Sequence, residues 1–120
     1  MPRGDSLGRE ATFYLGLASY AHGDLAKAES AFTYLASQFP LTEVRNNLGV
    51  VAARRGEKTA LEDFQNAVQA DPNDPDYRFN LALTYFRAGD LASASRQLRE
   101  ALNLQPSDSQ AKSLLDTIST

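Results

Sequence analysis

Two asparagines, Asn47 and Asn80, each directly precede a leucine and recur at a spacing of about 33 residues. An asparagine side chain carries both hydrogen-bond donors and an acceptor. A row of such groups can therefore form hydrogen bonds with the backbone amide groups of an extended peptide, whatever side chains the peptide carries. The alternative is a solvated polar residue on an exposed helix face, because a spacing that occurs twice is a short series. We take both asparagines as candidate contacts to a peptide backbone.

Apolar and cationic residues recur around the same positions. Aromatic side chains are good interface anchors because they bury a large area with few rotatable bonds. Two arginines, Arg54 and Arg87, recur at the same spacing as the asparagines and could place positive charge at the edge of a binding surface. The alternatives are that the apolar residues pack under neighbouring helices and that the arginines are solvated. Besides the asparagines, the candidate binding residues are Phe13, Leu17, Tyr20, Val50, Arg54, Phe79, Leu83, Phe86 and Arg87.

No arrangement of residues for catalysis or metal binding is visible. The chain has no cysteine, which excludes thiolate metal sites and a cysteine nucleophile, and its one histidine, His22, cannot build a zinc site by itself. The seven glycines are scattered and form no phosphate-binding loop. We predict that the chain is not an enzyme and holds no cofactor or metal.

The composition is typical of one folded domain. Of the 120 residues, 42% are hydrophobic and 22% are charged. The formal net charge of −3 argues against the basic face that nucleic-acid binding requires. No apolar run approaches the roughly 20 residues that cross a bilayer. We therefore expect a protein or peptide partner, with no nucleic acid and no membrane; the location is left open, with a cytoplasmic one slightly favoured.

The chain repeats itself with a period of about 33 residues. Each copy has a leucine, a glycine, an alanine and a proline in the same order. The glycine can adopt the left-handed conformation that ends a helix, and the proline cannot continue one. Each copy therefore predicts two helices joined by a tight turn. The recurring positions are Leu15, Leu48 and Leu81; Gly23, Gly56 and Gly89; Ala28, Ala60 and Ala94; and Pro40, Pro72 and Pro106.

The repeats predict where helices begin and which residues form the core. Asp24 and Asp90 follow turn glycines and suit helix caps, and Asp74 does so before Pro75. Small residues such as Gly16 are expected where paired helices approach closely, and the recurring leucines, Leu15 included, are expected in the core. The predicted helices lie near 7–22, 24–38, 42–55, 57–70, 75–88 and 90–104.

A seventh helix is predicted after these three copies. Ser107–Gln110 has the pattern of a capping box, and Ala111, Leu114, Leu115 and Ile118 then recur at helical spacing. The opposite face is polar. This pattern indicates the capping helix that ends a repeat array, or else the first helix of a fourth copy.

These residues resemble the tetratricopeptide repeat (TPR) family over about residues 9–106. The third copy matches best, through Leu81, Ala82, Tyr85, Gly89, Ala94, Ala101 and Pro106. The resemblance implies an all-α fold, a right-handed α-solenoid of three helix-turn-helix repeats with a C-terminal solvating helix. Its expected parts are a flexible lead-in (1–8), three repeats (9–40, 42–74 and 75–106) and a capping helix (107–120).

The resemblance also implies a function. The first helix of each repeat would line a concave groove that binds a peptide or helical segment, in a scaffold or assembly role and within a larger protein. The alternative is a structural spacer, or a self-association element that forms a weak homo-oligomer through the solenoid ends. Alignment of the first helices adds further residues to the expected wall, among them Glu10, Tyr14, Glu43, Asn46 and Asp76.

Some members of the family clamp the carboxylate terminus of chaperone tails with lysine, asparagine and arginine side chains. The matching places here carry Phe13, Leu17, Asn47, Asp76 and Asn80, of which only Asn47 fits. Apolar and acidic groups in place of the cations remove the charge that such a tail needs. We therefore predict no chaperone-tail clamp.

Overall fold

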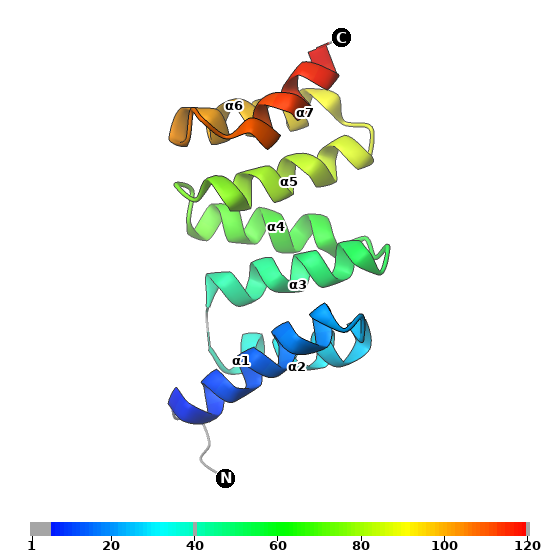
Figure 1. Ribbon diagram of the computed structural model, residues 1–120, viewed down its shortest axis with the longest axis vertical. Coiled ribbons are helices and arrows are strands. Elements are labelled where there is room, and N and C mark those ends of the chain that lie inside the picture. Colours follow the sequence, from blue (N-terminus) through cyan, green and yellow to red (C-terminus); the bar gives the residue numbers. More distant parts are fainter. Residues whose placement is uncertain (1–5, 40, 120) are drawn as a thin grey trace. The chain divides into compact units, whose positions relative to one another are not determined.

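The computed structural model describes residues 6–39 and 41–119, which form seven α-helices and no strand (Figure 1). The all-α prediction is confirmed, and each end of the six predicted repeat helices lies within two residues of its predicted place. The helix α1 begins at Ser6, inside the stretch predicted as a lead-in; residues 1–5 of that stretch lie outside the described residues. The helices are α1 (Ser6–Ala21), α2 (Leu25–Gln38), α3 (Thr42–Arg54), α4 (Thr59–Ala70), α5 (Pro75–Arg87), α6 (Leu91–Leu104) and α7 (Ser109–Ser119).

The recurring glycines form the turns inside the hairpins, as predicted. Gly23, Gly56 and Gly89 have φ values of 85°, 73° and 86°, in the left-handed region that favours glycine. The next helix begins with a side-chain cap in two of the three hairpins. The Asp24 carboxylate accepts a hydrogen bond from the backbone N–H of Lys27, and the Asp90 carboxylate accepts one from Ser93, both at 3.1 Å.

The chain divides after Asp63 into two compact units, and α4 crosses the division. In the first unit, α2 contacts both α1 and α3. Its core contains Phe32 and Leu35 from α2 and Val44 and Val51 from α3, all at 1% exposure or less. A Cβ atom on Gly16 would lie 2.6 Å from the Phe32 ring, so the predicted close approach of α1 and α2 is confirmed.

In the second unit, α6 contacts both α5 and α7. Its core contains Ala82 from α5, Leu98 and Ala101 from α6, and Ala111 from α7, all fully buried. The apolar stripe of α7 packs against this core, as the helical spacing predicted. The helix α7 therefore completes the second unit.

The predicted capping box at the start of α7 is wrong by one residue. The cap is Asp108, whose carboxylate accepts hydrogen bonds from the backbone N–H groups of Gln110 and Ala111, both at 3.1 Å. A carboxylate at this position satisfies two free N–H groups and also interacts favourably with the positive end of the helix dipole. Ser107 lies one residue before the cap.

The prediction that Leu15 belongs to the core is also wrong, because this side chain is 50% exposed. Its equivalents are covered: Leu48 packs against the core of the first unit, and Leu81 is buried. The core that covers Leu48 contains residues of α2, the helix before α3. Within the described residues no helix precedes α1, so nothing there covers Leu15 in the same way.

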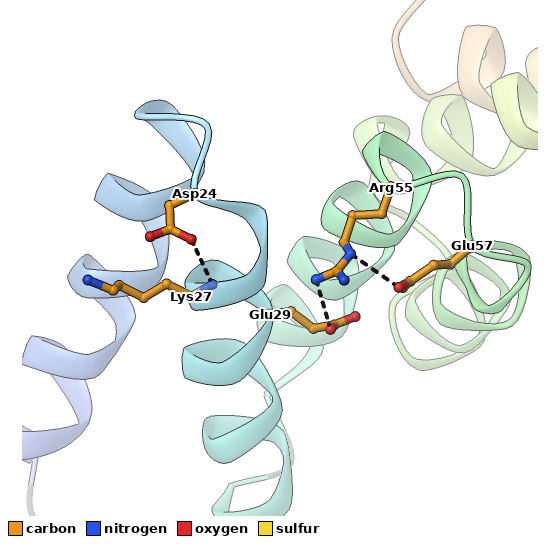
Figure 2. A network of polar contacts seen from close by, with 5 residues as sticks. All are labelled: Asp24, Lys27, Glu29, Arg55 and Glu57. Atoms are coloured by element: carbon orange, nitrogen blue, oxygen red, sulfur yellow. Dashed lines mark hydrogen bonds and ion pairs between the residues drawn. The ribbon is translucent and has the colours of Figure 1, made fainter.

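Charged residues join α2 to the turn between α3 and α4 in the first unit (Figure 2). One Arg55 guanidinium nitrogen donates to the Glu29 carboxylate at 3.2 Å, and another contacts Glu57 at 3.2 Å. These side chains are about one-third exposed, so each pair stabilises the fold by about 1 kcal/mol or less.

Candidate binding pockets

The first unit has a pocket of about 340 Å³ between the N-terminal half of α1 and the start of α3. Phe13 lines it and packs edge-on against the buried Phe32, with ring centroids 6.0 Å apart and an interplanar angle of 66°. The rings of Tyr14 and Phe13 also lie edge-on, with centroids 6.0 Å apart. Because Phe32 belongs to the core, Phe13 is held in place before any ligand arrives. The lining consists of Arg9, Glu10, Phe13, Tyr14, Leu41, Thr42, Glu43 and Val44.

Three charged residues line this pocket. Glu10 and Glu43 are exposed, and neither forms an ion pair within the part of the chain that the structure describes. The third, Arg9, has its guanidinium carbon 4.9 Å from the centroid of the Phe39 ring, a cation–π contact at the end of α2. The described lining therefore carries two carboxylates and one guanidinium, which lies over the Phe39 ring.

The second unit has a pocket of about 410 Å³ between α5 and α7. Phe79 and Leu83 come from α5, and the other lining residues come from α7. None of the lining residues is charged. They are Phe79, Leu83, Ser109, Gln110, Ser113, Leu114 and Thr117.

The two pockets have a phenylalanine at the same place in the repeat. Phe13 and Phe79 are separated by two periods of the sequence, and both pack against the core of their own unit. The second repeat has Asn46 at this place, and that side chain is buried. The recurrence in the first and third repeats places the two pockets at corresponding positions along the chain.

The structure joins two of the predicted binding residues to each other. One Arg54 guanidinium nitrogen donates to the Tyr20 hydroxyl at 3.2 Å, and its guanidinium carbon lies 5.1 Å from the centroid of the Tyr20 ring. Arg54 is thus partnered inside the first unit, and Tyr20 packs partly against the core. Neither residue lines the pocket of that unit.

The other predicted residues have varied surroundings. Asn47 and Asn80 are both half-buried, and the Asn47 amide nitrogen is buried without a hydrogen-bond partner. Leu17 is 39% exposed and Arg87 is exposed. Val50 and Phe86 are half-buried. Of the predicted set, Phe13 lines the pocket of the first unit described above, and Phe79 and Leu83 line that of the second.

Family models for the tetratricopeptide repeat match residues 58–118 in one case and residues 3–41 and 15–75 in another. The chain belongs to the tetratricopeptide repeat family. A curated TPR relative, the TPR repeat-containing thioredoxin TTL4 of Arabidopsis thaliana, is 29% identical over 114 residues. That alignment covers 92% of this chain and 17% of the relative, so the chain spans about a sixth of that protein's length.

Solved TPR structures have the same fold. The first TPR of Spaghetti (RPAP3), bound to the HSP90 peptide SRMEEVD, has a TM-score of 0.90 and 20% identity, covering 96% of this chain and 93% of that one. PcrH in complex with the chaperone binding region of PopD has a TM-score of 0.88 and 23% identity, covering 99% and 97%. At these identities the similarity establishes the TPR fold alone.

Alignment of the TPR first helices missed part of each pocket. In the first unit it omitted Arg9, Leu41, Thr42 and Val44, which lie around the helix starts. In the second unit it omitted α7, for which the sequence indicates either a capping helix or the first helix of a fourth copy. The sequence does contain a sign that α7 corresponds to the first helix of a repeat. Its capping residue, Asp108, follows the α5 cap, Asp74, at close to one period of the sequence.

No helix among the described residues is long and apolar enough to cross a membrane. No group of three or more histidine, cysteine, aspartate or glutamate side chains is placed to hold a metal ion in residues 6–39 and 41–119.

Proposed function

We propose that this chain is a protein-interaction module in which the pocket of each unit binds a segment of another protein, with no catalytic role. The observation that carries the proposal is the recurrence of a pocket lined by a phenylalanine, Phe13 or Phe79, between helices that begin successive repeats. The peptides held by the Spaghetti domain and by PcrH support the same function.

The first unit presents apolar side chains that are already in position for a partner to bury. Tyr14 is 60% exposed and Leu17 is 39% exposed on α1, next to the rigidly held Phe13. Full burial of a large apolar side chain contributes about 1.5–3 kcal/mol. Because Phe13 is fixed by the core, a partner loses little additional side-chain entropy on this side of the interface.

Asn47 and Asn80 are proposed to hydrogen-bond with the partner's backbone. The buried, unpartnered amide nitrogen of Asn47 costs about 1–3 kcal/mol in the free protein. A rotation of the side chain that brings this nitrogen to a carbonyl oxygen of the partner would recover that cost. Replacing both asparagines with alanine should then weaken partner binding and leave the helical content, measured by circular dichroism, unchanged.

Two exposed tyrosines provide a matched test of the pocket. Peptides are selected from a phage-displayed library on the wild-type chain, and their affinities are measured by fluorescence anisotropy. Tyr14→Ala removes an aromatic group that lines the pocket, whereas Tyr34→Ala removes one of similar exposure (51%) from α2. We expect Tyr14→Ala to weaken binding about tenfold, as for an interface anchor, and Tyr34→Ala to have little effect. Equal effects of the two substitutions would contradict the proposal.

The exposed apolar residues of α1 favour self-association as a second candidate function. Tyr14, Leu15 and Leu17 are all exposed on this helix, and among the described residues no helix precedes α1 to cover Leu15. Light scattering over a concentration series separates the two candidates. A mass that rises with concentration and returns to that of the monomer in Leu15→Glu would favour self-association, whereas a constant monomeric mass would exclude it.

A further inference from the structure

We infer that the pocket of the first unit receives a lysine or arginine side chain of the partner. This inference rests on the proposed function and specifies the chemistry of one contact within it. It depends on three features of the pocket: its aromatic wall, its two carboxylates, and the lack of an ion pair to either carboxylate among the residues that the structure describes.

The aromatic wall suits the stem and the charge of a long cationic side chain. Phe13 and Tyr14 lie edge-on to each other, so their rings present differently oriented surfaces to the pocket. The methylene groups of a lysine or arginine can pack on such a surface while the charged end stays hydrated or paired. A cation close to an aromatic face also gains about 0.5–1 kcal/mol at exposed sites.

The carboxylates come from two different helices. Glu10 belongs to α1 and Glu43 to the first turn of α3, and both line the same pocket. They occupy equivalent places in successive repeats. Neither has an ion-pair partner among the described residues. Two carboxylates and one guanidinium, that of Arg9, leave the described lining with an excess of negative charge.

Other occupants fit this pocket less well. An acidic side chain would meet two like charges. A purely apolar side chain would displace water from Glu10 and Glu43 without replacing its hydrogen bonds, which is unfavourable. The second unit's pocket gives a contrast within the same chain, because Phe79 and Leu83 line it together with uncharged residues only.

The test is a titration of the ¹⁵N-labelled chain followed by NMR. The probes are the Nα-acetyl, C-methylamide derivatives of lysine, arginine and norleucine, the last being an uncharged analogue of lysine. We expect saturable shifts for the cationic probes at residues 9–14 and 41–44, and none at the pocket of the second unit. Norleucine amide should bind about fivefold more weakly, as expected for loss of about 1 kcal/mol of charge interaction.

Two sets of variants connect the shifts to the carboxylates. In Glu10→Gln/Glu43→Gln the affinity for lysine amide should fall to that for norleucine amide, with the helical content unchanged. Glu100→Gln removes an exposed carboxylate from α6, outside both pockets, and should bind lysine amide as the wild type does.

Three outcomes would overturn the inference: no saturable shift with lysine amide, equal binding of norleucine amide, or unchanged lysine binding in the double variant. All three leave the proposed function open to its own test. That function fails separately, when selected peptides bind Tyr14→Ala as tightly as they bind the wild type.

Discussion

At the scale of single residues, the close packing of α1 against α2 depends on a glycine, which has no side chain. Gly16 allows α1 to lie against Phe32, a ring that is 1% exposed. The period of the sequence predicted this small residue, since Gly49 and Ala82 occupy the same place in the next two repeats. Buried atoms so close together leave no room for a methyl group.

Gly16→Ala should therefore destabilise the chain. The added Cβ would lie 2.6 and 2.7 Å from two carbons of the Phe32 ring, which cannot move freely in the core. Overpacking of this kind costs about 1–3 kcal/mol, and the better helix propensity of alanine offsets up to about 1 kcal/mol. We expect a net loss of about 1–2 kcal/mol in the free energy of unfolding, measured with urea.

A double-mutant cycle with Phe32→Leu provides the control. If the ring causes the cost, Gly16→Ala should be much less destabilising when leucine replaces Phe32. Equal costs in the two backgrounds would show that the contact between Gly16 and Phe32 is not the cause.

The residue scale is also where prediction from the sequence was weakest. Periodicity placed Leu15 in the core because it marks equivalent positions, but it does not show which copy has a neighbouring helix to cover them. It also named Arg54 and Tyr20 as separate binding residues without indicating the hydrogen bond that joins them. Such contacts depend on side-chain conformations that a repeat pattern does not specify.

At the scale of helices and turns, most of the structure was predictable. Each hairpin turn is a glycine with positive φ, and the aspartates that follow Gly23 and Gly89 cap the next helix. These features are local in the sequence, so they could be interpreted without knowledge of the fold. The error at α7 has the same local origin, because Ser107 and Asp108 are both good caps and only one of them can be used.

The cap of α6 should make stability depend on pH. The hydrogen bonds from Ser93 lower the pKa of the Asp90 carboxyl below its usual value. A carboxyl whose pKa is lower in the folded state stabilises the fold above its unfolded pKa, and this contribution disappears as the pH falls through the folded pKa. The urea midpoint of the wild type should exceed that of Asp90→Ala at pH 7, and the difference should shrink at acidic pH. A difference independent of pH would contradict this role of the charge.

At the scale of the whole molecule, the sequence predicted the family and the fold but only part of the lining of each pocket. The repeat pattern gave the TPR fold, which the family models and solved structures bear out. The pockets were harder to predict, since each is formed between helices of different repeats and depends on how those helices pack. The sequence identified Phe13 and Phe79 as candidate binding residues because they recur. It did not identify the residues of α7 as binding residues.

The chain should not bind the acidic peptide SRMEEVD, although the Spaghetti domain of similar fold does. The places that match the lysine, asparagine and arginine side chains of the clamp carry Phe13, Leu17, Asn47, Asp76 and Asn80 here, so its cations are missing. An acidic peptide would also meet Glu10 and Glu43 in the pocket of the first unit. Isothermal titration should show no saturable heat at peptide concentrations of about 100 µM, which corresponds to binding weaker than about −5.5 kcal/mol. Binding at low micromolar affinity would contradict the prediction.

The central claim is that partners bind between the helices that begin successive repeats. Its most direct test is an NMR map of the ¹⁵N-labelled chain with a peptide selected on it. The account predicts that the largest shifts fall on the lining residues of the two pockets, in α1, at the start of α3, in α5 and in α7. Shifts centred on the exposed residues of α2 and α6, with both pockets unaffected, would contradict it.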